Sequence, residues 1–276
     1  MPDHPPDRLR ASRKGLADLA AVVLGACLAS LTPVAAEERP RHEHGLAKGD
    51  CNAPRPVTDL RHCSFAGRML MGLDLHGADL SRVDLSNAIL SHCDLIGANL
   101  RGANLKWADL STCRIRRADL TGADLFHTRL DRADISGSVL RNAFLFGTDM
   151  NEVRADDVDL SGAHMKDVLM ENGLMRRANL SGVYMLRGAI LGSDLRWTKL
   201  TGVEMTGASA EQVNFSGADL SGARLRGARL VSAVFIGANL EGADLENAAF
   251  EKTDFRGALH IPESVARRLS EGWRAD

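Results

Sequence analysis

Aromatic residues and long hydrophobic runs are both scarce in this chain of 276 residues, of which only 4% are aromatic. The clearest apolar run, from Leu19 to Leu31, is too short to cross a bilayer as a helix. An excess of one charge is lacking too, because the chain beyond residue 36 holds 30 basic and 33 acidic residues. This composition argues against a membrane-spanning segment and a nucleic-acid-binding surface, and fits one soluble repeat domain.

Catalytic motifs are also missing. The sequence contains no G-x-S-x-G, no phosphate-binding loop and no isolated Cys/His pair. Among nine histidines, only His42 and His44 have metal-ligand spacing, and a solvated polar tail explains them better. Carboxylates such as Asp79, Asp119 and Asp124 recur with the repeat described next. The sequence therefore predicts no catalytic site, no cofactor and no metal site.

What the sequence does have is a period of five residues. The stretch IGANLRGANLKWADL, residues 96–110, places Leu at every fifth position and Ala two residues before each Leu. Five residues advance a helix by about 500°, so the leucines would drift around it, and an odd step sends them to alternate faces of a strand. The period therefore predicts a chain that turns a corner once per repeat.

The register holds from Phe65 to Phe255 without insertion or deletion. Its 39 central positions are all apolar: 23 Leu, 6 Met, 5 Phe, 3 Ile and 2 Ala. Two residues before each centre the side chain is nearly always small, and it is Ala 19 times. We expect both positions to point inward, the other three to face water, and glycines such as Gly102 to form turns with positive φ.

This pattern resembles the pentapeptide repeat family, written loosely as A-(D/N)-L-x-x, over residues 61–258. The resemblance implies an all-β fold, a right-handed quadrilateral parallel β-helix with four repeats per coil. Nearly ten coils would give a rod of about 47 Å at the ~4.8 Å spacing between strands. Residues 146–215 depart from the consensus, with Met at six centres, so we expect looser packing there but no domain break.

The N-terminus has the layout of an export signal. Basic residues precede the apolar run, and Val34-Ala35-Ala36 suits cleavage, which predicts a signal peptide over 1–36 and a leader over 37–60. A lipoprotein signal is an open alternative, because Leu24-Gly25-Ala26-Cys27 resembles a lipobox and would lipidate Cys27. A buried N-terminal helix is a third reading. The first reading predicts a periplasmic or secreted protein.

Export changes what the cysteines are expected to do. Cys51 and Cys63 flank the start of the rod, where a disulfide would tie the leader to the first coil; both being free is the alternative. Cys93 and Cys113 occupy inward small positions four repeats apart, which is one coil in the implied geometry. They should stack directly on consecutive coils as small hydrophobes.

The C-terminal residues 259–276 leave the period. Pro262 can open a helix in which Val265, Leu269 and Trp273 recur every four residues. Because the last coil of a solenoid exposes its core and its strand edge, we expect this helix to cap the rod. The family resemblance adds that such a segment can mediate dimerisation.

Outward-facing apolar side chains gather on one side of the predicted rod, in repeats centred on 105, 125, 145 and 185. They are Trp107, Phe126, His127, Phe144, Phe146, Tyr184 and Leu186. A contiguous apolar patch predicts a surface for a protein partner or a second copy of the chain. The alternative is that these side chains fold flat and cover one another.

The sequence leaves three candidate functions open. The first is a non-catalytic exported scaffold or protein-binding module of the bacterial envelope. The second rests on the resemblance, since some pentapeptide repeat proteins mimic DNA and bind gyrase in quinolone resistance; it needs a cytoplasmic, acidic rod. The third is an enzyme or effector with a site that the sequence does not reveal. Composition and the N-terminus favour the first.

Overall fold

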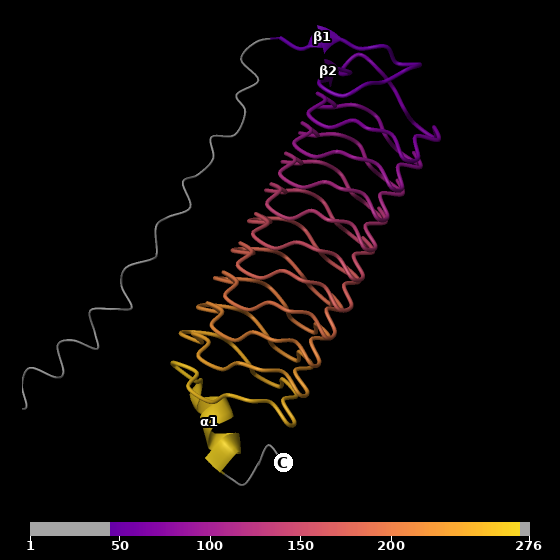
Figure 1. Cartoon of the computed structure of the whole chain (residues 1–276). Helices are drawn as coiled ribbons and strands as arrows, with labels where there is room; N and C mark the ends of the chain where they lie inside the picture. Colours follow the sequence, from indigo (N-terminus) through magenta and orange to yellow (C-terminus); the bar gives the residue numbers. More distant parts are fainter. Residues whose placement is uncertain (1–44, 271–276) are drawn as a thin grey trace, which may run out of the picture. The chain divides into compact units, whose positions relative to one another are not determined.

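The computed structural model describes residues 45–270, which form a right-handed quadrilateral parallel β-helix (Figure 1). The residue before each centre forms a parallel bridge with its equivalent four repeats later, so Asp79 pairs with Asn99, and Asn99 with Asp119. Four repeats therefore make one coil, and consecutive coils are hydrogen-bonded along every side. This is the architecture that the sequence predicts.

One repeat shows how the chain turns each corner. The N–H of Leu100 donates to the carbonyl of Asp119 on the next coil at 2.7 Å, and the N–H of Ala103 donates back to the carbonyl of Leu100 at 3.0 Å. Gly102, which lies between Leu100 and Ala103 in the chain, has φ +62°, as a type II turn requires. The prediction of positive φ at this position is confirmed, although side chains such as Arg82 (φ 61°) also occupy it.

The core is a column of large side chains, one per repeat, with small side chains beside the corners. All six methionines at central positions between Phe65 and Phe255 are fully buried. Met170 and Met185, for example, are 0% exposed. A Cβ at Gly173 or Gly188 would lie 2.7 Å from the Cγ of Met170 or Met185, so the methionines fill the space that these glycines leave. The expectation of looser packing over 146–215 is therefore wrong.

Polar side chains at the small inward positions are satisfied by backbone carbonyls. The Thr128 hydroxyl donates to the carbonyl of Leu105 at 2.7 Å, and the Cys93 thiol to that of Leu70 at 2.8 Å. Cys113 repeats the bond one coil later, and both cysteines are free and 0% exposed. They behave as the sequence predicts.

The N-terminal end carries two short parallel strands, β1 (Ala47–Lys48) and β2 (Thr58–Asp59). A disulfide joins Cys51 to Cys63 on the first coil, with the Cα atoms 5.5 Å apart. It ties the described part of the leader to the rod as expected. The proposed signal peptide, Cys27 and His42 to His44 lie outside the described residues.

The C-terminal end is covered by helix α1 (Glu263–Ser270). Its buried residue is Val265, 1% exposed, while Leu269 packs partly against the core. The carbonyl of Pro262 accepts from the N–H of Val265 and of Ala266, so the proline lies just before the helix. Within residues 45–270 no helix is long and apolar enough to cross a membrane.

Candidate functional site

The side of the rod centred on residues 105 to 185 carries a nearly continuous group of rings. We define the aromatic face by eight side chains: Trp107, Phe126, His127, Phe144, Phe146, His164, Tyr184 and Leu186. Seven of them are the residues that the sequence placed on this side, and His164 is added by the structure. The β-helix puts them together because each coil returns to the same side after four repeats.

The N-terminal part of the aromatic face is a cluster of four rings in mutual contact. Trp107 stacks on His127 with ring centroids 4.4 Å apart and planes 10° apart. Phe126 stacks on Phe146 at 5.3 Å and meets the edge of Trp107 at 5.5 Å. Each such pair contributes about 0.5–1.5 kcal/mol beyond the area it buries. The rings therefore hold one another in fixed positions.

The second part is a column of three rings on bridged backbone positions. Phe144 stacks on His164 at 5.2 Å, and His164 contacts Tyr184 at 6.4 Å. The residues that the sequence placed on this side included His127 but not His164. The register itself could have found it, since His164 lies one coil after Phe144 and one coil before Tyr184.

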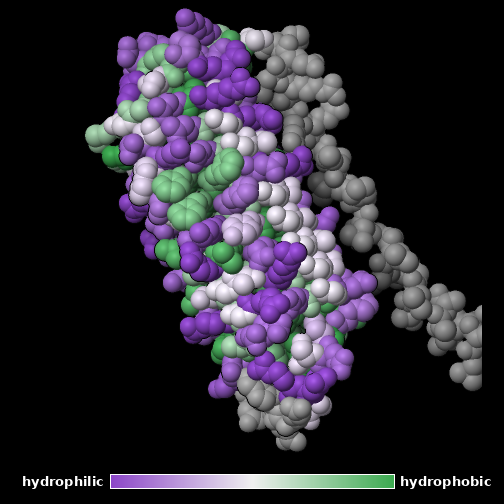
Figure 2. Space-filling model, turned by 180° about the vertical axis from the view of Figure 1, so that it is seen from behind, coloured by the Kyte–Doolittle hydropathy of each residue, from purple (hydrophilic) through white to green (hydrophobic). Residues whose placement is uncertain are grey.

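Packing within the aromatic face leaves substantial ring surface open. Trp107 is 56% exposed, Phe144 48% and Tyr184 39%, while Phe126, His127 and Phe146 are half-buried. The alternative that the side chains cover one another thus holds for part of the group only. Figure 2 shows hydrophobic side chains gathered in the N-terminal half of one long side, within a mainly hydrophilic surface.

A shallow depression of about 340 Å³ lies in the aromatic face. Its apolar lining is Trp107, Phe126, Phe144 and Phe146, and its polar rim is the ion pair of Lys106 with Asp124, whose charged atoms are 3.1 Å apart. The Lys166 ammonium lies 5.4 Å from the centre of the Phe146 ring, which is part of this apolar lining. An apolar centre with a charged rim is the composition of a protein interface.

The backbone under Trp107 is unfavourable for its side chain. Its φ is 61°, in the left-handed region that 19 glycines and 22 non-glycine residues of the described chain occupy. A residue with a Cβ costs about 1–2 kcal/mol there, so stability alone does not select tryptophan at this corner. Trp197 has the same backbone (φ 57°) and exposure (55%), but lies on another side, over Gly217.

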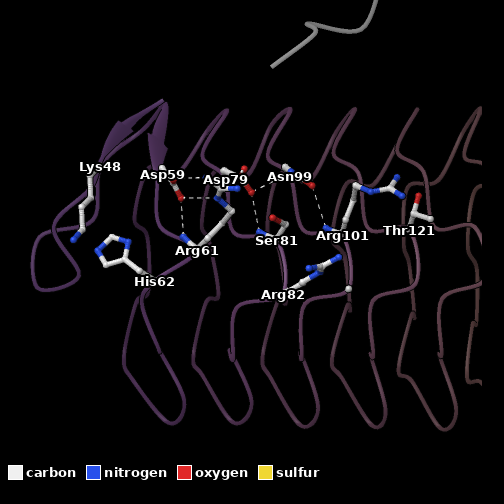
Figure 3. Close-up of a pocket in the computed structure, with 11 residues that line it drawn as sticks. Lys48, Asp59, Arg61, His62, Asp79, Ser81, Arg82, Asn99, Arg101 and Thr121 are labelled. Carbon is white, nitrogen blue, oxygen red and sulfur yellow. Dashed lines mark hydrogen bonds and ion pairs between the residues drawn. The ribbon is translucent and has the colours of Figure 1, made fainter. Parts of the chain in front are cut away.

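A second depression, about 930 Å³, is polar and lies near the N-terminal end (Figure 3). Several of its polar groups are engaged in the fold: Arg61 donates to both carboxylate oxygens of Asp59 at 2.9 and 2.6 Å, and the Asn99 amide donates to Asp79 at 3.0 Å. The Arg61 side chain and backbone N–H lower the pKa of Asp59 from 3.8 to about 2. These contacts stabilise corners of the rod.

A chain built of stacked coils, each with four sides, is a β-helical repeat solenoid. The family model of pentapeptide repeats matches in eight copies over residues 58–167 and 178–257. The chain therefore belongs to the pentapeptide repeat family.

Several solved structures are similar to this chain. HetL from Nostoc sp. strain PCC 7120, a pentapeptide repeat protein involved in heterocyst differentiation regulation, is 27% identical over 71% of this chain and 89% of its own, with a TM-score of 0.42. QnrB1, a plasmid-mediated fluoroquinolone resistance protein, is 19% identical over 75% and 90%, with a TM-score of 0.38. A thylakoid-lumen protein from Arabidopsis thaliana is 31% identical over 35% and 71%, with a TM-score of 0.23. No curated protein matches.

Proposed function

We propose that this chain is a non-catalytic, exported binding module that holds a protein partner, or a second copy of itself, through the aromatic face. The observation that carries the proposal is the exposure of Trp107 within a cluster of rings, where it contacts Phe126 and His127 on one side of the rod. Exposed apolar rings gathered on one side of a monomer suit an interaction outside it. Tryptophan and tyrosine are also the residues that dominate binding energy in protein interfaces.

The size and rigidity of the aromatic face suit this role. Repeats centred on 105 to 185 lie four coils apart, which is about 19 Å along the rod at the ~4.8 Å strand spacing. Rings that already stack on one another lose little conformational freedom when a partner docks, so binding costs less entropy. A small, preorganised apolar centre is therefore available without rearrangement of the rod.

The DNA-mimic alternative has less support, because the outer surface pairs its charges along the rod axis. Arg132 binds Glu152 through two bonds of 3.0 Å, and Arg177 and Arg187 bind Asp157 and Asp167 in the same manner one coil apart. Each of these columns thus pairs an acidic group with a basic group on the next coil or the one before it. DNA mimicry needs a continuous acidic surface.

The binding role is tested by replacing Phe126 and Phe146 together with Ser. We expect the rod to stay folded with a modest loss of unfolding free energy, because the variant removes ring pairs of two half-buried side chains, while self-association or partner binding weakens at least tenfold. The control is Trp197→Gly, which removes an exposed ring from another side. A double variant that unfolds would make the rings structural; one that matches the parent in sedimentation and partner binding would end the proposal.

Export is tested separately by mass spectrometry of the native protein. Cleavage after Ala36 predicts Glu37 as the first residue, from the apolar run and the small residues that follow it. A lipid-modified Cys27 would favour the lipoprotein signal. An intact N-terminus in the cytoplasm would contradict export.

A further inference from the structure

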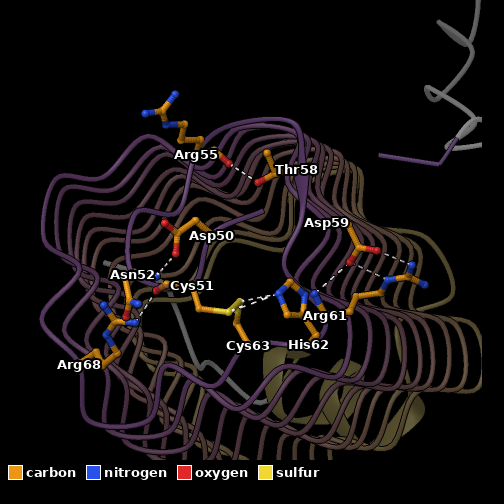
Figure 4. Close-up of a disulfide and its surroundings, with 10 residues drawn as sticks. All are labelled: Asp50, Cys51, Asn52, Arg55, Thr58, Asp59, Arg61, His62, Cys63 and Arg68. Carbon is orange, nitrogen blue, oxygen red and sulfur yellow. Dashed lines mark hydrogen bonds and ion pairs between the residues drawn. A yellow bond between two sulfur atoms is a disulfide. The ribbon is translucent and has the colours of Figure 1, made fainter. Parts of the chain in front are cut away.

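The disulfide at the N-terminal end has a histidine directly beside both sulfur atoms (Figure 4). The Nε2 atom of His62 lies 3.5 Å from the Sγ of Cys51 and 3.8 Å from the Sγ of Cys63. These three ligand atoms all lie within 4.8 Å of one another. His62 and Cys63 come from the first coil, and Cys51 comes from the turn after β1.

The distances match those between ligands of one metal ion. Zn–S bonds of about 2.3 Å and Zn–N bonds of about 2.0 Å at tetrahedral angles place a nitrogen and a sulfur about 3.6 Å apart. The imidazole therefore already stands at ligand distance from both sulfurs. Only the two sulfurs have to separate, and Cys51 lies on a partly exposed turn.

We propose that reduction of the Cys51–Cys63 disulfide converts this cluster into a binding site for a thiophilic cation such as Zn²⁺, with His62 as the third ligand. A dithiol reductant supplies two electrons and two protons, so the S–S bond becomes two thiols and the reductant becomes a disulfide. Zn²⁺ then displaces both thiol protons and binds two thiolates and the neutral imidazole. The fourth position stays open to water.

The surroundings support a dithiolate site over a carboxylate site. Lys48 lies on the same side as His62 and lines the same depression (Figure 3), and the Arg68 guanidinium donates to the carbonyl of Cys51. Nearby cations favour thiolates, and two thiolates neutralise the charge of Zn²⁺. The nearest carboxylates are engaged, since Asp50 accepts from the N–H of Asn52 and Asp59 binds Arg61.

The site would keep the leader attached in either redox state. In the oxidised chain a covalent bond joins Cys51 to the first coil, and in the reduced chain the metal would join the same two residues. The inference is independent of the aromatic face and of export. The sequence did not indicate it, because His62 directly precedes Cys63 but stands well after Cys51, and this spacing matches no zinc motif.

The test is titration of the purified full chain with Zn²⁺ and Co²⁺ after reduction by a phosphine under argon. We expect one equivalent bound, with thiolate-to-Co²⁺ charge-transfer absorbance, and no such absorbance in the oxidised chain. His62→Ala should weaken Zn²⁺ binding at least about tenfold, while His76→Ala, which changes an exposed histidine elsewhere, should not. Zn²⁺ should also restore the protection of residues 45–60 from protease that reduction removes.

A paired variant, Cys51→Ser with Cys63→Ser, keeps Cys93, Cys113 and the histidines of the N-terminal segment. It should bind no metal with charge-transfer absorbance. Binding that survives in this variant, or equal affinities of the parent and His62→Ala, would overturn the proposal. Equal binding by the oxidised and reduced chains would overturn it as well.

Discussion

At the residue scale, the position before each centre both caps a corner and faces its equivalents on the neighbouring coils. Asp84 accepts from the backbone N–H of Ser86 at 3.0 Å, and the Ser86 hydroxyl and N–H hold the pKa of Asp84 below its usual range. A lowered pKa stabilises the fold above the unfolded value of about 3.9, and this contribution is lost as the pH falls through the folded pKa. Stacked carboxylates repel one another, and Asn99 separates Asp79 from Asp119.

Replacing Asn99 with Asp tests that separation. The Asn99 amide donates to Asp79 at 3.0 Å, and Asp59 lies one coil before Asp79. Asp119 lies one coil after Asn99, so the variant stacks four carboxylates. Repulsion raises the folded pKa of the new carboxyl and should cost about 1 kcal/mol at neutral pH. Below about pH 4 the new carboxyl is neutral in both the folded and the unfolded state, so the loss of stability should vanish there. It should also shrink in high salt, which screens the repulsion.

Urea unfolding of Asn99→Asp at pH 7 and pH 3.5 measures this effect. Asn99→Ser is the control, because it removes the amide without adding a charge. A penalty for Asn99→Asp that is the same at both pH values and in 1 M salt would show that the column does not work by charge separation.

At the element scale, helix α1 covers the last coil, as each coil covers the one before it. Val265 is 1% exposed, and the Arg268 guanidinium lies 4.0 Å over the ring of Phe250 while it donates to the carbonyl of Ala248. The helix thus covers apolar surface and satisfies part of the open end. Without it, the end of the rod would offer a template for another chain.

Val265→Asp should detach this helix, because an unpaired charge cannot stay buried against the last coil. We expect the β-helix to persist by far-UV circular dichroism, while light scattering shows larger species that form end to end. Ala266→Asp places the same charge on the exposed side of α1 and serves as the control. Equal molar masses for the two variants and the parent would mean that α1 is not a cap.

At the scale of the whole molecule, the period predicts the fold because its register is unbroken. A central residue such as Leu120 is buried wherever the five-residue count puts it, and the side on which Trp107 lies follows from a count of four repeats per coil. Features that depend on side-chain conformation could not be predicted from the period. The methionines that fill glycine gaps, such as Met170, and the imidazole of His62 beside two sulfurs are set by rotamers, which a period does not encode.

The same distinction applies to the aromatic face. Its position was predictable from the sequence, whereas its division into a four-ring cluster and a three-ring column was not, because ring contacts depend on χ angles. Trp107 and Trp197 show why counting alone is insufficient. Both have the same exposure and the same backbone, yet Trp107 joins other rings and Trp197 packs over Gly217 next to Arg196.

These two tryptophans provide the most direct measurement of the proposed binding role. A photo-crosslinking amino acid is placed at Trp107 in one variant and at Trp197 in another, and each is expressed and irradiated in the cells that produce the protein. Both positions are equally exposed, 56% and 55%, so random collisions label them equally. If the aromatic face binds a partner, position 107 gives one discrete adduct, with another protein or with a second copy of the chain, and position 197 does not. Equal labelling, or no adduct at either position, would contradict the account.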